Sequence, residues 1–214
     1  MVSALGRART FARYYDTNYW ADPESRSGPG SRQDSPHVRH ALEVLAAVTE
    51  RYAIRTIADI PCGDFNWIDA HLRAWPEVEY SGFDIVPRLI ERNRRVFPGR
   101  RFARFDIVLG VPPPCDLIFC KDLINHLEDH EIVQAIAHMR QSGSRYLLAT
   151  NNFGYLNRPL TRDRYHHSRH VDLTTAPFHY PPPIWHDHYL GLWPLVDMAQ
   201  GPASVPAAPR DIPG

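Results

Sequence analysis

The amino-acid sequence predicts an α/β fold with a mostly parallel, doubly wound sheet, on three observations. Short apolar runs alternate with segments of helical periodicity along residues 36–150. Turn-forming Gly, Pro and Asp residues separate the runs. The first three runs each end in an aspartate, at Asp59, Asp84 and Asp106. Alternating strands and helices indicate parallel βαβ units, and the ligand site of such a sheet lies at the carboxyl ends of its strands.

Composition predicts one ordinary globular domain. The 214 residues are 43% hydrophobic, enough to bury one sizeable core. We expect a single domain over residues 1–198 and a disordered tail at 199–214. The 24 basic and 24 acidic residues leave no net charge, so nothing draws the whole protein to nucleic acid or membrane. Without a signal peptide or an apolar run of ~20 residues, and with three unpatterned cysteines, we expect a soluble, cytoplasmic protein with reduced thiols.

Residues 1–35 are expected to pack on the domain as an arm. They carry more aromatic surface than a free tail would, from Phe11, Tyr14, Tyr15, Tyr19 and Trp20. The segment ESRSGPGS at 24–31 is rich in turn formers. Two interpretations of this segment stay open: a flexible connection, or a loop whose free N–H groups lie near the ligand.

The elements of the sheet follow in order. Ser35 and Pro36 suit the N-cap and first residue of a helix, and an apolar stripe continues it to Tyr52. The same patterns predict further helices at 68–75, 87–95 and 129–140, and strands at 56–60, 78–83, 101–105, 116–120, 146–150 and 189–198. The last strand is expected to run antiparallel, at or near the sheet edge.

Seven arginines gather on the helix at 87–95 and on the strand after it. They are Arg88, Arg92, Arg94, Arg95, Arg100, Arg101 and Arg104. Such a cluster can bind RNA, but an exposed helix face beside a strand is its commoner origin. No aromatic-rich recognition motif accompanies it. We therefore expect no nucleic acid partner.

Residues 151–188 show no regular pattern and are predicted to form a functional loop or lid. They hold six histidines: His166, His167, His170, His179, His186 and His188. Two of them have the i, i+4 spacing of metal ligands, but no tight motif such as H-E-x-x-H is present, and we expect no metal. Arginines in the same stretch, Arg169 among them, suit an anionic ligand.

The loop PCGD at 61–64 and the three strand-end acids form the predicted ligand site. Gly63 lacks the Cβ that would block a ligand, and the N-terminus of the next helix would offer N–H groups to a carboxylate. Asp59 either accepts from an ammonium or orients the loop. Asp84 offers paired acceptors to two ribose hydroxyls. Asp106 suits the amine of an adenine that its apolar neighbours sandwich.

A dinucleotide-dependent oxidoreductase is the nearest alternative, because Asp84 falls about where such an enzyme places a ribose-binding acid. However, the G-x-G-x-x-G run is missing, and Pro61 and Phe65 stand where small residues would admit a pyrophosphate. Asp106 would also have no function in that class. The pattern therefore favours S-adenosylmethionine.

Four motifs resemble those of class I S-adenosylmethionine-dependent methyltransferases: DIPCGD at 59–64, GFDI at 82–85, FDI at 105–107 and DLIFCKD at 116–122. The resemblance covers about residues 36–150. It implies a Rossmann-like, mostly parallel seven-stranded sheet, with helices on both faces and the sixth and seventh strands as a reversed, antiparallel edge. A narrower likeness to a small bacterial group of such enzymes extends to Trp20, to 24–31 and to LGLW at 190–193.

The resemblance also implies the cofactor, S-adenosyl-L-methionine, and the residues that hold it: Asp59, Pro61, Cys62, Gly63, Asp84, Ile85, Phe105, Asp106, Ile107 and Lys121. The family's loop usually has three glycines, and here Pro61 and Phe65 replace the outer two. We therefore expect a stiffer loop and a changed path for the methionine tail of the cofactor.

Catalytic residues are predicted after the fourth and fifth strands. His126 is the first candidate for general base, because the usual pKa of histidine lies near neutrality. A helix-end histidine that packs beneath the cofactor stays open as the alternative. Asp122 is the second candidate, or holds the cofactor or an acceptor amine. Asn151, Asn152 and Arg169 are predicted to bind the acceptor.

The predicted reaction is methyl transfer to an O or N atom of a small molecule, in a biosynthetic pathway. The motif after the fourth strand is not the Asn/Asp-Pro-Pro-Tyr type associated with adenine or glutamine amide methylation, which favours a small acceptor. An RNA or protein methyltransferase and a non-catalytic S-adenosylmethionine-binding scaffold stay open as alternatives. We expect a monomer or homodimer that binds no membrane.

Overall fold

Strands and helices alternate along the chain. The computed structural model describes residues 4–160 and 168–200. The strands are β1 (Thr56–Asp59), β2 (Glu79–Asp84), β3 (Arg101–Arg104), β4 (Leu117–Cys120), β5 (Tyr146–Thr150), β6 (Trp185–His186) and β7 (Leu190–Pro194). The helices are α1 (Ala4–Asp16), α2 (Pro36–Arg51), α3 (Asp69–Ala74), α4 (Pro87–Val96) and α5 (Asp129–Gln141), with short 3₁₀ turns η1 (Pro29–Ser31), η2 (Ile124–His126) and η3 (Asp197–Gln200).

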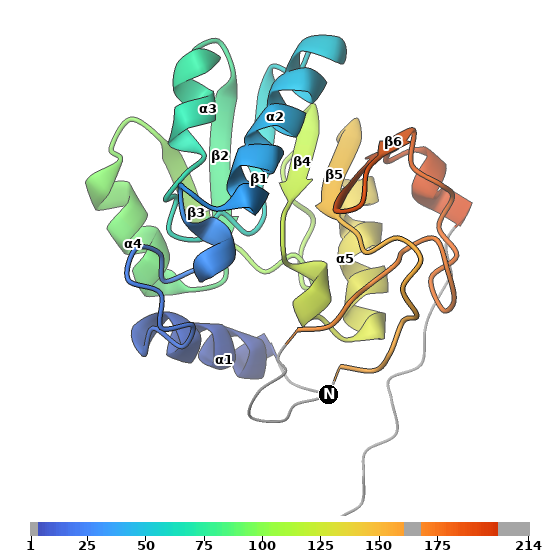
Figure 1. Ribbon diagram of the computed structural model, residues 1–214, viewed down its shortest axis with the longest axis horizontal. Helices are drawn as coiled ribbons and strands as arrows, with labels where there is room; N and C mark the ends of the chain where they lie inside the picture. Colours follow the sequence, from blue (N-terminus) through green and yellow to red (C-terminus); the bar gives the residue numbers. More distant parts are fainter. Residues whose placement is uncertain (1–3, 161–167, 201–214) are drawn as a thin grey trace, which may run out of the picture. The chain divides into compact units, whose positions relative to one another are not determined.

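The strands form a seven-stranded sheet in the order β3-β2-β1-β4-β5-β7-β6 (Figure 1). β1 pairs in parallel with β2 and β4, and β2 pairs in parallel with β3. β7 runs antiparallel to both β5 and β6. The chain divides into two compact units.

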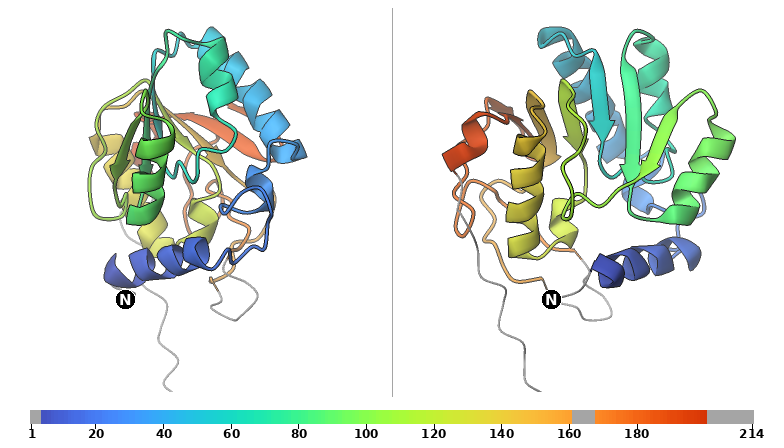
Figure 2. Two further views of the ribbon diagram at one scale, coloured as in Figure 1. Left: turned by 90° about the vertical axis from the view of Figure 1, so that its left-hand side faces the viewer. Right: turned by 180° about the vertical axis from the view of Figure 1, so that it is seen from behind.

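The first unit contains Val2–Asp106 and Cys115–Phe119, and therefore β1, β2, β3 and most of β4. α2 lies on one side of these strands and α4 on the other (Figure 2). The apolar stripe that predicts α2 is buried, with Val38, Ala41 and Leu45 at 0% exposure. Full burial of a valine or leucine side chain contributes about 1.5–3 kcal/mol, so this face holds α2 against the sheet.

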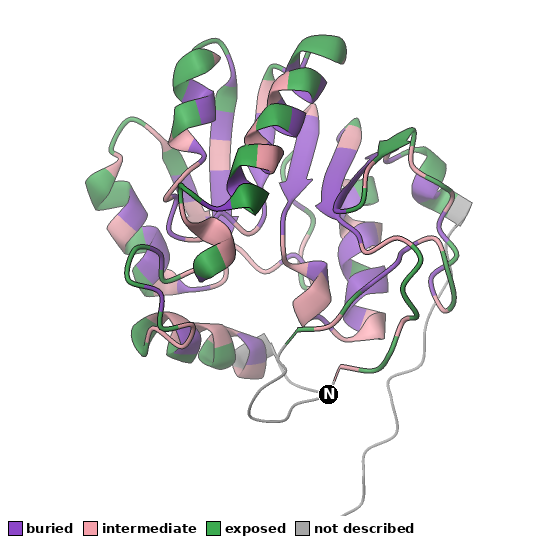
Figure 3. Cartoon of the chain, in the orientation of Figure 1, coloured by how far each residue is buried: buried purple, intermediate pink, exposed green. Residues whose placement is uncertain are grey.

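The second unit contains Ile107–Pro114 and Cys120–Gly214, with β5, β6, β7 and α5. β5 is buried over four of its five residues (Figure 3). It pairs with β7 along its whole length, from Tyr146 opposite Pro194 to Thr150 opposite Leu190. Because the pairing ends at Thr150, the long segment after β5 starts from a strand end that is held in the sheet.

Local polar contacts set the ends of α5 and the position of β7. A capping box opens α5, in which the Glu128 and Glu131 side chains each accept the other's backbone N–H. Gly143, with φ 76°, follows the end of α5 in the left-handed conformation that glycine favours. The fully buried Trp193 of β7 donates its indole N–H to the Pro181 carbonyl at 2.9 Å.

The predicted α/β fold and its antiparallel edge are confirmed, and the predicted elements up to β5 lie within one residue of the observed ones. Two details are wrong. The segment 189–198 is not one strand, because β7 ends at Pro194, a residue without an N–H, and η3 follows from Asp197. The sixth strand is not reversed: β6 is antiparallel to β7, so it runs in the sense of β5.

The extent of a single domain over 1–198 stays a prediction. Of the predicted tail, residues 199 and 200 belong to η3, and 201–214 lie outside the described residues. In the part of the chain that the structure describes, no helix is long and apolar enough to cross a membrane.

Candidate functional site

The loop after β1 stays hydrogen-bonded to the strands on both sides of β1. A cis peptide joins Ile60 to Pro61. The N–H of Ile60 donates to the Phe119 carbonyl at 2.9 Å, and the N–H of Cys62 donates to the Phe83 carbonyl at 2.8 Å. The loop backbone is therefore fixed at the carboxyl ends of β4 and β2.

Phe65 combines a glycine-like backbone with a core side chain. Its φ of 57° lies in the left-handed region that glycine enters without strain. Its ring is 2% exposed and packs on Tyr80, Phe97 and Phe102 at centroid distances of 5.2, 4.7 and 5.1 Å. Phe65 therefore has a left-handed backbone in the loop, and its ring packs into the core.

Gly63 makes room for the N-terminal arm. A Cβ on Gly63 would lie 2.6 Å from the Ser27 hydroxyl oxygen, and its φ is 51°. Its N–H points to the Asp84 carboxylate at 3.3 Å, and its carbonyl accepts from the Asn93 amide at 2.8 Å. The neighbour that requires a glycine here is a serine of the chain itself.

Asp64 anchors the arm to the loop. Its carboxylate accepts from the Ser25 hydroxyl and the Arg26 N–H, both at 2.9 Å, and from the Ser27 hydroxyl at 3.2 Å. The Gly28 N–H donates to the Ser25 carbonyl. The segment 24–31 thus lies against the loop, but the N–H groups of Arg26 and Gly28 already donate to acceptors within the chain. In the sequence, the two serines two residues apart, Ser25 and Ser27, are the feature that indicates this contact.

Asp84 at the end of β2 is a buried acid whose carboxylate accepts backbone N–H groups. One carboxylate oxygen accepts from the Val86 N–H at 2.9 Å and the other from the Gly63 N–H at 3.3 Å. Burial raises the pKa of the Asp84 carboxyl to about 6, although these N–H groups act to lower it. The next residue, Ile85, is half-buried.

Asp59 and Cys62 face the interior. The Asp59 carboxylate is 3% exposed and accepts from the Tyr80 hydroxyl at 2.7 Å, a contact that suits its predicted role in orienting the loop. The Cys62 thiol is buried with its sulfur 4.0 Å from the Asn93 amide nitrogen, and burial raises its pKa well above the usual value. Cys62 is therefore an uncharged core thiol, whereas its neighbour Pro61 is half-buried.

Asp106, after β3, pairs with an arginine from α1. The Arg7 guanidinium donates to the Asp106 carboxylate at 2.9 Å, and the two side chains are only 9% and 14% exposed. The preceding residue, Phe105, donates its N–H to the Asp84 carbonyl at 2.9 Å, which ties the end of β3 to the end of β2. Its ring lies 5.6 Å from that of Phe83.

The helix after the loop, α3, starts at Asp69, one residue after the predicted start, so residues 65–68 separate it from Asp64. That its N–H groups meet the carboxylate of a ligand stays a prediction. The Asp69 carboxylate accepts from Arg100 at 3.1 Å and lies 3.4 Å from Arg73.

Five of the seven clustered arginines have polar partners within the first unit. Arg92 donates to the Asp64 carbonyl at 2.7 Å and Arg94 to the Phe102 carbonyl at 2.8 Å. The other three, Arg88, Arg100 and Arg101, pair with Asp16, Asp69 and Glu79.

In the second unit, Asp122 is the centre of a polar cluster. Its own side chain is 35% exposed, whereas its partners Lys121, Thr150 and Tyr189 are buried. The Lys121 ammonium lies 2.5 Å from its carboxylate, and the Tyr189 hydroxyl donates to it at 2.9 Å. The Thr150 hydroxyl accepts from the Asp122 N–H and donates to its carboxylate. Burial alone would raise the pKa of Asp122, but Lys121 and Tyr189 outweigh it and hold that pKa below the usual value. Asp122 is thus a stable anion and a poor proton acceptor.

His126 lies in η2, close enough to Asp122 to lower the pKa of that carboxyl further. The ring is half-buried. The catalytic roles of His126 and Asp122 stay predictions. Tyr189 and Thr150 were missed, because their relation to Asp122 spans 67 and 28 residues of sequence.

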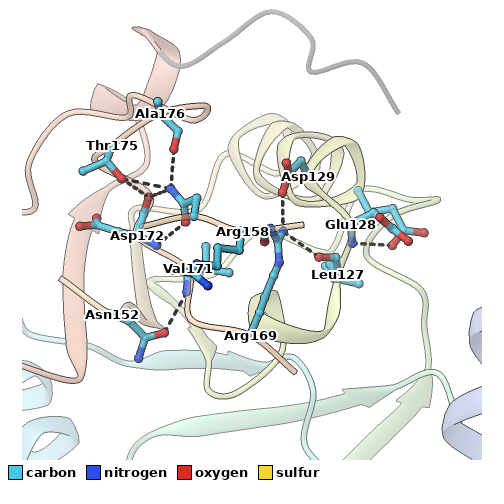
Figure 4. A network of polar contacts seen from close by, with 12 residues as sticks. Leu127, Glu128, Asp129, Asn152, Arg158, Arg169, Val171, Asp172, Thr175 and Ala176 are labelled. Carbon is cyan, nitrogen blue, oxygen red and sulfur yellow. Dashed lines mark hydrogen bonds and ion pairs between the residues drawn. The ribbon is translucent and has the colours of Figure 1, made fainter. Parts of the chain in front are cut away.

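Asn151 and Asn152 hold the long loop after β5 together (Figure 4). The Asn151 side chain, fully buried, donates to Asp172 at 3.2 Å and accepts the Leu173 N–H at 2.8 Å. The Asn152 side chain accepts the Val171 N–H at 3.0 Å, and its N–H donates to the Val171 carbonyl. Their acceptor-binding role stays a prediction, and these contacts give both amides a structural one.

Arg169 clamps the same loop onto the start of α5 (Figure 4). Its guanidinium donates to the carbonyls of Arg158 and Leu127 at 2.5 and 3.0 Å and pairs with the Asp129 carboxylate at 2.5 Å. Its side chain is 6% exposed. Most of its donors are thus committed to the fold, and its role in binding an anion stays a prediction.

The remaining predicted residues are placed as follows. Ile107 is buried, and its carbonyl lies 2.7 Å from the His138 ring nitrogen. His166 and His167 lie outside the described residues. Among the residues that are described, no group of three metal-ligating side chains comes together.

The strand order and the reversed β7 define the Rossmann-like class of methyltransferase folds. Solved structures share it at low identity. The S-adenosylmethionine-dependent methyltransferase SibL in its apo form is 14% identical, with a TM-score of 0.54 over 73% of this chain and 55% of that one. Magnesium protoporphyrin IX methyltransferase ChlM from Synechocystis PCC 6803 with bound SAH is 16% identical, with a TM-score of 0.50 over 69% of each chain.

Among curated proteins, the chain is similar to trans-aconitate 2-methyltransferases. That of Rhodopseudomonas palustris (strain BisB5) is 29% identical over 98 residues, and that of Acidovorax sp. (strain JS42) is 32% identical over 100 residues. The match takes in 45–46% of this chain and spans 38% of the length of each relative. No protein-family model matches. The resemblance to class I S-adenosylmethionine-dependent methyltransferases is confirmed.

Proposed function

We propose that this chain binds S-adenosyl-L-methionine and transfers its methyl group to a small-molecule acceptor. The observation that carries the proposal is Asp84, a buried carboxylate at the end of the middle one of three parallel strands. A buried acid is costly unless donors satisfy it. The two hydroxyls of a ribose are donors of the right kind for its paired oxygens.

The other residues fit the same ligand. Asp106 and Phe105 would hold the adenine, and the backbone of residues 61–63 would approach the amino acid part. When bound, S-adenosylmethionine supplies an electrophilic methyl group on a sulfonium. The contribution of the protein is then to align the acceptor, exclude water and, where needed, remove a proton.

We further propose that the acceptor is a carboxylate of a small polycarboxylic acid. The support is the similarity to enzymes named trans-aconitate 2-methyltransferase, over part of their length. An ionised carboxylate has an electron pair available and no proton to lose, so it needs no base. His126 would then act toward it as a hydrogen-bond donor, whereas a hydroxyl or amine acceptor would need His126 to take a proton.

Two measurements test the proposal. Calorimetry with S-adenosylmethionine and S-adenosylhomocysteine should show binding that Asp84→Asn weakens; the absence of binding by both would overturn the cofactor assignment. Transfer of labelled methyl from S-adenosylmethionine to trans-aconitate should give a product with the alkali lability of a methyl ester. Label retained only in RNA or protein of a cell extract would favour a macromolecular acceptor, and no transfer at all would favour a binding scaffold.

His126→Gln distinguishes the two acceptor chemistries. With a carboxylate acceptor, kcat should change by less than about tenfold, because no proton is removed. With a hydroxyl or amine acceptor, the loss should be about 10²–10⁴-fold, the usual worth of a general base. His130→Gln, on the first turn of α5, is the matched control. A large loss with trans-aconitate would contradict the carboxylate mechanism.

A further inference from the structure

Arg7 is an unusual residue for the start of an amphipathic helix, because it is charged and buried. The whole residue is 8% exposed, and its side chain is 9% exposed. Its partner, Asp106, is 99 residues away in sequence. A buried ion pair seldom adds stability over apolar residues of the same size, because both charges lose their water. The pair therefore calls for an explanation other than packing.

The arm that carries Arg7 runs along the ends of the three parallel strands. Arg7 contacts the acid after β3 at 2.9 Å, Asp16 at the end of α1 lies 3.6 Å from Arg88 of α4, and Ser25 and Ser27 bind the loop after β1. Figures 1 and 2 show α1 on the side of these strands to which they point. The arm thus reaches the same strand ends as the proposed cofactor.

The arm is itself well packed. The rings of Tyr14 and Tyr19 stack at 4.5 Å, that of Trp20 lies edge-on to Tyr19 at 4.9 Å, and Trp20 closes over Gly28. Arg7 therefore belongs to a packed segment of the chain and not to a free tail.

We propose that Arg7 is a positioning residue for adenine recognition: it fixes the Asp106 carboxylate as an oriented anion, so that the N-terminal arm forms part of the cofactor site. A guanidinium donates along fixed directions, so the contact at 2.9 Å sets the orientation of the Asp106 carboxylate. A carboxylate has about four lone-pair positions, which leaves capacity for an adenine amine besides one guanidinium. The inference rests on the proposed function, because it presumes that Asp106 meets the adenine.

The test compares two ligands by calorimetry: S-adenosylhomocysteine, and S-inosylhomocysteine, in which a carbonyl oxygen replaces the adenine amine. The unmodified protein should prefer the first by about tenfold or more, because the Asp106 carboxylate repels a carbonyl oxygen. Arg7→Gln should weaken binding of S-adenosylhomocysteine and reduce the preference to within about threefold. Arg7→Lys, which keeps the charge, should retain part of it, and the exposed Arg9→Gln on the same helix should change neither affinity.

The outcomes separate the claims. If the unmodified protein binds neither ligand, the proposed function fails. If it binds and discriminates, and Arg7→Gln weakens both ligands equally or neither, Arg7 has only a structural role and the inference is wrong. If circular dichroism shows that Arg7→Gln does not fold, Arg7→Lys decides the question. Lysine keeps the charge but lacks the two-pronged guanidinium. If Arg7→Lys prefers S-adenosylhomocysteine over S-inosylhomocysteine as strongly as the unmodified protein does, the positioning role is wrong.

Discussion

At the scale of single residues, the proposed contact of Asp84 with the ribose predicts that cofactor affinity depends on pH. Its pKa of about 6 means that it is protonated below that pH and ionised above it. Ribose hydroxyls would donate to the ionised form, so binding would favour loss of this proton. The affinity for S-adenosylhomocysteine should therefore be constant above pH 6.5 and fall by about tenfold per pH unit well below 6.

Calorimetry between pH 5 and 7.5 measures this directly. Asp84→Asn has no titrating group at this position, so its weaker affinity should not vary over the same range. If the variant and the unmodified protein show the same pH profile, another group controls binding and Asp84 does not meet the ribose.

At the scale of elements, Gly63 couples the arm to the loop after β1. Gly63→Ala places a Cβ at φ 51°, 2.6 Å from the Ser27 hydroxyl oxygen. The left-handed backbone alone should cost about 1–2 kcal/mol, and the clash adds to it. Gly143→Ala is the matched control, because φ there is 76° but no atom lies within 4 Å of the added Cβ.

Urea unfolding of four variants separates strain from clash. Gly63→Ala should lower the free energy of unfolding by more than Gly143→Ala does. In a Ser27→Gly background the cost of Gly63→Ala should shrink toward that of Gly143→Ala, since the clashing hydroxyl is gone. Equal costs in both backgrounds would mean that the arm does not press on the loop.

At the scale of the whole molecule, local sequence patterns predict the elements and the order of the acids, but not what the acids touch. Periodicity and turn residues place β1, β2 and β3 within one residue, because each pattern is local. The pairs Arg7 with Asp106 and Tyr189 with Asp122 join distant segments, and no local pattern records them. The packing of Phe65 is another long-range feature: its ring joins Tyr80, Phe97 and Phe102 in a core cluster, which the sequence of the loop alone does not indicate.

Acid sensitivity of the folded chain should come in part from His71, packed between α3 and α2. It is 4% exposed, its ring lies 3.4 Å from the Thr49 hydroxyl, and burial lowers its pKa from 6.5 to about 4. Between these values the unfolded chain binds more protons than the folded one, so the free energy of unfolding falls as pH drops from 6.5 to 4. The full effect is about 1–3 kcal/mol.

His71→Gln should remove this part of the pH dependence, with His37→Gln on the exposed face of α2 as the control.

Asp84 acts in the opposite sense, because its pKa is raised from 3.8 to about 6. Between these pH values the folded chain binds more protons at this site than the unfolded chain, so the free energy of unfolding falls as pH rises from 3.8 to 6. In urea titrations at pH 5, 6 and 7.5, His71→Gln should therefore be less sensitive to acid than the unmodified protein, and Asp84→Asn more so. If the free energy of unfolding varies with pH in the same way for all three proteins, burial shifts the pKa of neither His71 nor Asp84 in the folded chain.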